Sequence, residues 1–220
     1  ICSLKYLLLL ISLCNDKLGK FLYKKSLNPN NSNLIVNIKS IDFAFKRLGI
    51  QTKLSNSVEE ITKADKVIFP GVGEASSAMR MLCENNLDKL IPQLEQPVLG
   101  ICLGMQLLCN YSEEGDTKGL GVFDVDIKRF NSDLKVPQMG WNTIYDLKSM
   151  LFNKIGNNEY MYLVHSYYAE LCENTISKTN YGFEYSTALR RNNFYGVQFH
   201  PEKSGVFGEQ ILDNFLKIGK

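Results

Sequence analysis

The residues most suited to chemistry are a cysteine between two glycines and a histidine two positions before a glutamate. Cys102 stands in VLGICLGMQ (98–106), with Gly100 and Gly104 two positions away on each side. An apolar run leads into the cysteine and a helical pattern follows without a loop, so the chain must turn sharply. Small neighbours at these positions are typical of a nucleophile elbow, which lifts the nucleophile above the edge of a sheet.

The start of the following helix also favours a thiolate at Cys102. A buried, inert thiol is the commoner role of a cysteine. The two glycines argue against that role, because a glycine inside a strand or helix costs about 0.5–1 kcal/mol.

His200 is the best candidate for a catalytic base, since His165 is the only other histidine. YGVQFHPE (195–202) runs from an apolar strand into His200, Pro201 and Glu202. Residues two apart in an extended chain point to the same side, so Glu202 is placed to hold the imidazole ring. Thiol, imidazole and carboxylate together form a triad for nucleophilic catalysis. A histidine at a strand end is ordinarily structural, but the elbow favours the catalytic interpretation.

The segment PGVG (70–73) ends another short apolar run. If that run is a parallel strand, its loop lies at the carboxyl edge, where ligands bind. We then expect the backbone N–H of Val72 or Gly73, together with that of Leu103, to form an oxyanion hole. An ordinary turn is the alternative.

Alternating strands and helices must position these groups. Apolar runs at 66–69 and 97–101 predict buried strands, and residues 34–48, 75–90 and 103–110 follow a helical pattern. Further strands are predicted at 121–130, 159–169, 181–191 and 194–199, and a last helix at 206–217. The sequence therefore predicts an α/β fold of flavodoxin-like type, with a mostly parallel twisted sheet, helices on both faces and antiparallel strands in the second half.

Composition fits one such domain. The chain has 220 residues, 45% of them hydrophobic, and Lys plus Arg exceed Asp plus Glu by only 25 − 23 = 2. No basic run interleaved with aromatics suggests nucleic acid. The six cysteines follow neither a secreted disulfide framework nor paired zinc ligands, which indicates reduced thiols in a cytosolic protein.

The first 33 residues are atypical, and residues 34–220 form the predicted domain. Residues 6–14 (YLLLLISLC) are apolar but too few to span a bilayer, which takes about 20. They fit a signal-peptide core, a buried strand or a stretch foreign to the domain, and we favour the latter two. Residues 24–33 have the composition of a loop.

Five segments in order resemble the triad-type (class I) glutamine amidotransferases: PGVG (70–73), GICLGMQ (100–106), PQMGWN (137–142), YLVHSYY (162–168) and YGVQFHPEKS (195–204). Within that family they are most similar to the glutaminase subunit of imidazole glycerol phosphate synthase. The resemblance runs from about Asn37 to the C-terminus.

The resemblance implies a role for each matched position. Cys102 would be the nucleophile, His200 the base and Glu202 its orienting group. The residues expected around the glutamine substrate are Gln106, Glu114, His165, Ser166 and Tyr167, and those expected toward a partner are Pro137, Trp141, Tyr162 and Lys203.

The resemblance also implies the reaction. Glutamine would be hydrolysed to glutamate and ammonia, and the ammonia passed within a heterodimer to a (β/α)₈-barrel synthase of histidine biosynthesis. That partner makes imidazole glycerol phosphate and AICAR. No metal, organic cofactor, nucleic acid or membrane is implied, and the expected location is the cytoplasm.

The start of the chain departs from the family pattern. Residues 37–49 (NIKSIDFAFKRLG) match the first helix of the family, but the segment before them lacks the family's tyrosine and glycines. Either residues 6–13 supply the first strand through a long insertion, or the segment is an aberrant start.

Three other functions remain open. A paralogous amidotransferase would feed ammonia to another acceptor, such as a sugar-modifying synthase. A free-standing γ-glutamyl hydrolase would use the same triad without a partner. A non-catalytic regulatory subunit is disfavoured, because every triad position is filled.

Overall fold

The computed structural model describes residues 10–13, 32–71, 73–131 and 133–219. The helices within these ranges are α1 (Ser32–Arg47), α2 (Val58–Thr62), α3 (Ala75–Glu84), α4 (Leu87–Leu90), α5 (Leu103–Leu107) and α6 (Gly205–Lys217). Short 3-10 turns are η1 (Ile91–Gln93), η2 (Met150–Phe152) and η3 (Pro201–Lys203).

The strands form one large sheet and one two-stranded ribbon. Those of the large sheet are β1 (Leu10–Leu13), β2 (Thr52–Ser55), β3 (Lys66–Gly71), β4 (Val98–Cys102), β5 (Cys109–Ser112), β6 (Thr117–Lys118), β7 (Phe123–Arg129), β10 (Tyr167–Ala169), β11 (Thr175–Asn180), β12 (Glu184–Arg191) and β13 (Phe194–Val197). The ribbon pairs β8 (Gln138–Ile144) with β9 (Glu159–His165). The order in the large sheet is β2-β1-β3-β4-β13-β12-β10-β7-β5-β6, with β11 on β12.

The parallel pairs lie where the candidate site is built. β4 lies between β3 and β13, parallel to both, and β5 runs parallel to β7. The other pairs between described strands are antiparallel. The predicted α/β class is confirmed, with more antiparallel pairing than predicted.

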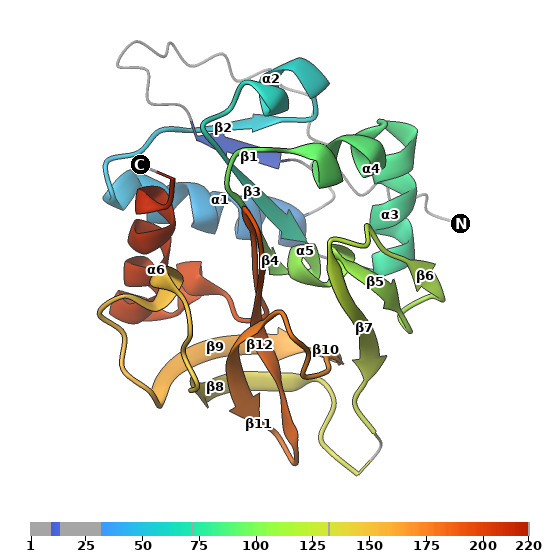
Figure 1. The fold of residues 1–220 in the computed structure, drawn as a ribbon, viewed down its shortest axis with the longest axis vertical. Coiled ribbons are helices and arrows are strands. Elements are labelled where there is room, and N and C mark those ends of the chain that lie inside the picture. Colours follow the sequence, from blue (N-terminus) through green and yellow to red (C-terminus); the bar gives the residue numbers. More distant parts are fainter. Residues whose placement is uncertain (1–9, 14–31, 72, 132, 220) are drawn as a thin grey trace.

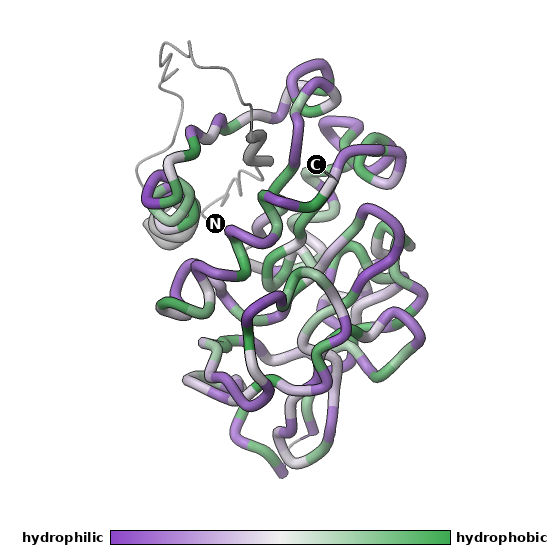
Figure 2. The backbone as a smooth tube through the Cα atoms, turned by 60° about the vertical axis from the view of Figure 1, so that its left-hand side comes forward, coloured by the Kyte–Doolittle hydropathy of each residue, from purple (hydrophilic) through white to green (hydrophobic). Residues whose placement is uncertain are grey.

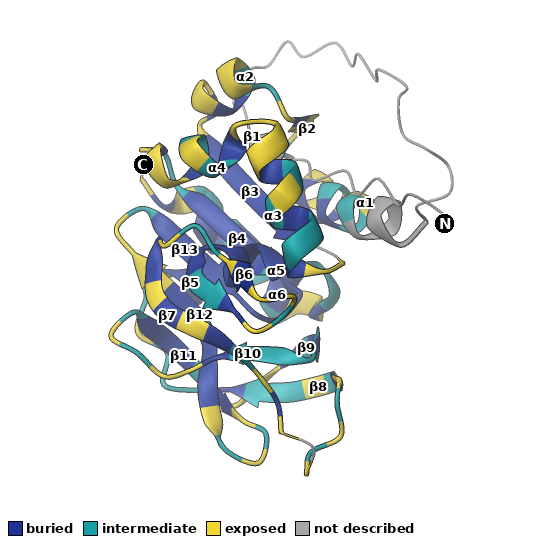
Figure 3. Cartoon of the chain, turned by 90° about the vertical axis from the view of Figure 1, so that its right-hand side faces the viewer, coloured by how far each residue is buried: buried dark blue, intermediate teal, exposed yellow. Residues whose placement is uncertain are grey.

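Helices cover both faces of the central strands (Figure 1). Val67 and Phe69 of β3 pack with α3, α4 and α5, while Ile68 packs with α1 and α6 on the opposite face. The strands β3, β4 and β13 are therefore almost fully buried, as Figure 3 shows. In Figure 2 the outer turns are mostly hydrophilic. Strands buried on both faces explain the continuous apolar runs in the sequence.

The N-terminal strand was an open question. Leu10–Leu13, the described part of 6–13, lies in the sheet between β2 and β3 and is antiparallel to both. Ile11 is opposite Ile68 of β3. Residues 1–9 and 14–31 lie outside the described residues.

Two predicted helices are wrong in extent. The helix expected at 75–90 breaks at Asn86, whose φ of 55° is left-handed, so α3 and α4 are separate. The helix expected at 103–110 ends at Leu107, and Cys109 begins β5. A short apolar run fits either a helix or a strand, which accounts for the second error.

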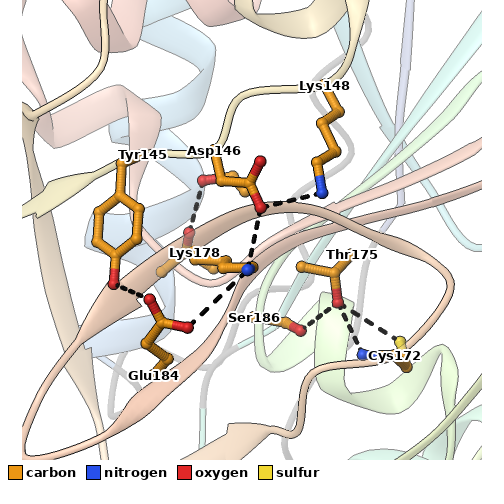
Figure 4. Close-up of polar contacts among 10 residues, drawn as sticks. Tyr145, Asp146, Lys148, Cys172, Thr175, Lys178, Glu184 and Ser186 are labelled. Carbon is orange, nitrogen blue, oxygen red and sulfur yellow. Dashed lines mark hydrogen bonds and ion pairs between the residues drawn. The ribbon is translucent and has the colours of Figure 1, made fainter.

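Polar contacts hold β11 and β12 to the loop after β8 (Figure 4). Lys178 on β11 pairs with Asp146 at 3.1 Å, and the Tyr145 hydroxyl donates to Glu184 at 2.9 Å. The buried hydroxyls of Thr175 and Ser186 lie 2.7 Å apart. These contacts fix β12, which carries a buried tyrosine toward the candidate site.

Candidate active site

The turn at Cys102 is a strained strand-to-helix corner. Cys102 ends β4 and caps α5 with a φ of 54°, a left-handed conformation rare for a residue with a side chain. A Cβ on Gly104 would lie 1.8 Å from the carbonyl oxygen of Phe69, and one on Gly100 would lie 2.8 Å from the backbone nitrogen of Met105. Both glycines are therefore required by close backbone approach, as the elbow interpretation predicted.

His200 meets this corner from β13, the strand next to β4. Its Nδ1 lies 2.8 Å from Oε1 of Glu202, and His200 and Cys102 line the same cavity, close enough for the charge of Cys102 to act on the imidazole. The Glu202 side chain is fully buried, and its Oε2 has no hydrogen-bond partner among the described residues. The three predicted triad residues are thus brought together.

The electrostatics of His200 favour its charged form. Burial alone would lower the pKa of this imidazole. The charges of Cys102 and Glu202 and the hydrogen bonds to both outweigh burial and raise the pKa to about 10. A protonated imidazole beside a thiol stabilises the thiolate, the reactive form of cysteine.

A cavity of about 290 Å³ opens beside the sulfur. Every residue predicted to lie around glutamine lines it: Gln106, Glu114, His165, Ser166 and Tyr167. Its wall also includes Cys102, Leu103, Gly73, Pro137 and His200. The volume is near the lower end for small-molecule sites.

Glu114 is held rigidly at this cavity. Its Oε2 accepts from the backbone N–H of Ala75 at 2.9 Å, at the start of α3. Ser112 and Thr117 bind its backbone N–H and carbonyl. Burial raises the pKa of this carboxyl, while the Ala75 N–H opposes the change. A fixed carboxylate at a cavity wall is suited to an ammonium group.

The chain that carries this site is similar to known proteins. The family model described as glutamine amidotransferase class-I matches residues 27–218. The chain belongs to the class I glutamine amidotransferases. It is 53% identical over 185 residues to the imidazole glycerol phosphate synthase subunit HisH of Bacteroides fragilis, covering 83% of this chain and 94% of the relative. The HisH subunit of Pectobacterium atrosepticum is 46% identical over 185 residues, which cover 83% of this chain and 94% of that relative.

The fold agrees with a solved relative. The glutaminase domain of Trypanosoma brucei CTPS, solved with bound acivicin, superposes with a TM-score of 0.59 at 15% identity, covering 88% of this chain and 91% of that one. The family resemblance predicted from the five segments is confirmed by the family model and by the HisH relatives.

The amidotransferase has two described candidates for an oxyanion hole. Gly73 and Leu103 both line the cavity beside Cys102, and Gly73 has a φ of 99°. Val72, the other predicted donor, lies outside the described residues. The parallel pairing of Gly71 with Cys102 brings the PGVG loop to the elbow.

A buried polar chain lies behind the cavity. The carbonyl of Tyr167 accepts from Nδ1 of His165 at 2.7 Å and from Nε2 of Gln106 at 3.0 Å. Burial lowers the pKa of His165 to about 4, so this ring is neutral at neutral pH. Its Nε2 lies 3.1 Å from the hydroxyl of Tyr185, which also hydrogen-bonds to Gln138 at 2.7 Å. Both ring nitrogens of His165 therefore have partners within the protein.

The residues predicted to face a partner fall on the β8–β9 ribbon and beside it. Trp141 is 55% exposed, and its ring meets Tyr162 edge-on at 6.0 Å. The Lys203 ammonium lies 6.0 Å from the centre of the Tyr162 ring. Pro137 immediately precedes β8 and also lines the cavity. The ribbon thus joins an exposed aromatic surface to the cavity wall.

Three further observations concern the part of the chain that the structure describes. Among the described residues, no cluster of His, Cys, Asp or Glu is arranged to hold a metal ion, and no helix is long and apolar enough to cross a bilayer. Cys83, Cys109 and Cys172 are free thiols, as is Cys102.

One residue at the sulfur was not predicted. Nε2 of Gln198 lies 3.7 Å from Sγ of Cys102. A signal was present, because Gln198, His200 and Glu202 alternate in YGVQFHPE and so share one side of an extended chain.

Proposed function

We propose that this chain is the glutaminase subunit of an imidazole glycerol phosphate synthase in histidine biosynthesis. The observation that carries the proposal is the meeting of Cys102, His200 and Glu202 at one end of a cavity that Glu114 also lines. The HisH relatives at 46–53% identity support the choice of pathway.

In the proposed reaction, the Cys102 thiolate attacks the carboxamide carbon of glutamine and forms a C–S bond. The carbonyl electron pair moves to oxygen, which the N–H groups of Leu103 and Gly73 stabilise. When the C–N bond breaks, protonated His200 gives its proton to the departing nitrogen, and ammonia leaves.

Water then releases the product. Neutral His200 takes a proton from water as the oxygen attacks the glutamyl thioester. The C–S bond breaks, glutamate leaves and the thiolate is restored. Glu202 holds the ring in one orientation through both steps and stabilises its charged form.

Substrate recognition follows from the fixed groups of the cavity. We assign the α-ammonium of glutamine to the Glu114 carboxylate, and its α-carboxylate end to backbone around His165, Ser166 and Tyr167. Both N–H groups of Gln106 are used within the protein. Its Oε1 is therefore the atom proposed to contact glutamine.

The proposed partner is a (β/α)₈-barrel cyclase that receives ammonia in a heterodimer and makes imidazole glycerol phosphate and AICAR, a lyase reaction. The exposed Trp141, with Met139 at 66% and Tyr160 at 57% exposure, supports a docking role for the β8–β9 ribbon. We further assign residues 34–220 to the amidotransferase domain and residues 1–33 to an atypical N-terminal segment. The proposal includes a cytoplasmic location, in line with cysteines that do not follow a secreted framework.

Ammonia release from glutamine tests the proposal, measured with and without the barrel cyclase for wild type and Cys102→Ala. We expect weak release by wild type alone, strong stimulation by the partner with its ligand, and none above background in Cys102→Ala. Equal release by both proteins would rule out the nucleophile. Stimulation by a different synthase only would reassign the acceptor.

A further inference from the structure

Gln198 lies directly behind the nucleophile. It follows the last residue of β13, and its side chain is completely buried. Its Nε2 donates toward Sγ of Cys102 across 3.7 Å, within the range of a hydrogen bond to sulfur. His200 lies two residues further along the same extended segment. One segment therefore brings both an amide and an imidazole to the sulfur.

The orientation of the Gln198 amide is fixed by its neighbours. The carbonyl of Tyr167 can only accept, so Gln106 must present its NH₂ group there. The second N–H of that group donates to Oε1 of Gln198 at 2.8 Å. A flipped Gln198 amide would set two NH₂ groups against each other. The N–H of Gln198 is therefore the end that faces the sulfur.

A backbone carbonyl thus determines which atom meets the nucleophile. Tyr167 orients Gln106, and Gln106 orients Gln198. Gln106 and Gln198 are each no more than 4% exposed, so water does not compete for these bonds. Hydrogen bonds in such surroundings are stronger than in water, and those to a charged acceptor are the strongest.

We propose that Gln198 is a further catalytic residue, whose amide N–H stabilises the Cys102 thiolate and holds the sulfur beside His200. Gln106 and the Tyr167 carbonyl are positioning groups for it. The inference rests on the proposed function, because it assigns Cys102 the role of nucleophile. The competing explanation is that Gln198 only fills the core with its polar ends satisfied.

The rate of Cys102 alkylation by iodoacetamide separates these explanations. It is measured from pH 5 to 10 by mass spectrometry of the Cys102 peptide, so that the other thiols do not interfere. Gln198→Met keeps the size and removes the amide. Asn214→Leu is the matched control, because Asn214 is a buried amide that binds the carbonyls of Leu151 and Asn153 away from the sulfur.

We expect Gln198→Met to lower the alkylation rate at pH 7 about tenfold and to move the midpoint of the pH profile up by about one unit, as loss of a hydrogen bond to a charged group requires. Asn214→Leu should lose stability without moving the midpoint. An unchanged rate and midpoint in folded Gln198→Met would overturn the proposal.

A second measurement does not depend on the folding of that variant. In ¹⁵N-labelled wild type, the side-chain amide protons of Gln198 should shift as pH passes the alkylation midpoint, and this shift should be absent in Cys102→Ala. An amide that does not respond in wild type, or responds equally in Cys102→Ala, contradicts the proposal.

Ammonia release distinguishes failure of the inference from failure of the proposed function. If wild type releases no ammonia with the cyclase, but Gln198→Met still slows alkylation, the proposed glutaminase function is refuted. The proposed hydrogen bond from Gln198 to the sulfur of Cys102 is then retained. Wild type that releases ammonia, with Gln198→Met equal to it in alkylation and in release, would refute the role of Gln198 alone.

Discussion

The backbone N–H of His200 donates to the carbonyl oxygen of Tyr162 across 2.9 Å. Tyr162 lies in the ribbon and packs against the exposed Trp141, whereas His200 lies beside Cys102. Ser204 strengthens the connection, because its hydroxyl accepts from the Tyr162 N–H and donates to the His200 carbonyl. The ribbon is therefore tied to the backbone of His200 by two short paths of hydrogen bonds.

The charge of His200 makes stability depend on pH. Its folded pKa of about 10 lies above its ordinary value of 6.5. The stabilisation it gives is thus complete below about pH 6.5 and is lost as pH rises through about 10. In Glu202→Gln the imidazolium loses its charged partner, so we expect the free energy of unfolding to fall by about 2 kcal/mol at pH 6. The difference should disappear toward pH 10.

Urea unfolding of wild type and Glu202→Gln at a series of pH values measures this difference. Glu209→Gln is the control, since Glu209 forms an exposed ion pair with Arg47. That control should change stability by less than about 1 kcal/mol. A Glu202→Gln difference that stays constant from pH 6 to 10 would show that the pair does not hold the His200 charge.

The close packing at the elbow predicts that substitution of Gly104 lowers stability strongly. A Cβ on Gly104 would overlap the Phe69 carbonyl of the neighbouring strand, so Gly104→Ala must push α5 away from β3. We expect a loss of at least about 3 kcal/mol in stability, or failure to fold, because moving α5 disrupts its packing against β3. Gly156→Ala is the control. Its Cβ would meet only the Glu159 carboxylate at 3.6 Å, and stability should change by less than about 1 kcal/mol in thermal unfolding.

Much of this site was predictable, because its constraints are local. Glycines two positions from Cys102 signal a tight corner, and alternation from His200 to Glu202 signals a shared face. These patterns depend only on backbone geometry, and the structure brings the three side chains together as expected. The long helices α1 and α6 were predictable for the same reason, since their apolar spacing is strongly periodic.

Strands β8 and β11 were not predicted, for two physical reasons, whereas β9 lies within the strand predicted at 159–169. Strand β8 turns Met139 and Trp141 outward, so its apolar residues do not mark a core face. Strand β11 is rich in hydroxyls, and these are buried in pairs such as Ser177 with Thr187 at 2.7 Å. A polar residue satisfied by a distant strand resembles a loop residue in the sequence. Gln198 lies within a predicted strand and shares a side with His200 and Glu202, but its contact with the sulfur was missed because Cys102 and Gln106 lie far away along the chain.

The buried hydroxyl of Tyr185 should be important for stability. It is the link between His165 and Gln138, and a hydroxyl carries only one proton for its two neighbours. Tyr185→Phe removes a hydrogen-bond partner from the buried side chains of both His165 and Gln138. We expect a loss of about 1–3 kcal/mol in urea unfolding. Tyr111→Phe, which removes an exposed hydroxyl bonded to Asp116, should be within about 0.5 kcal/mol of wild type. Equal losses in the two variants would contradict a special role for the buried chain.

Trp141 tests whether the ribbon is a docking surface. Its ring is half exposed and meets the ring of Tyr162 edge-on, and the carbonyl of Tyr162 accepts from the backbone N–H of His200. If it anchors the partner, Trp141→Ala should raise the cyclase concentration for half-maximal ammonia release at least about 30-fold, the effect of losing about 2 kcal/mol at an aromatic anchor. The weak release without partner should persist, because Trp141 is outside the proposed triad and is not among the residues that line the cavity at Cys102. Met150→Ala is the control, since Met150 is 67% exposed on η2, outside the ribbon. Equal half-maximal concentrations for Trp141→Ala and Met150→Ala would move the docking surface elsewhere on the protein.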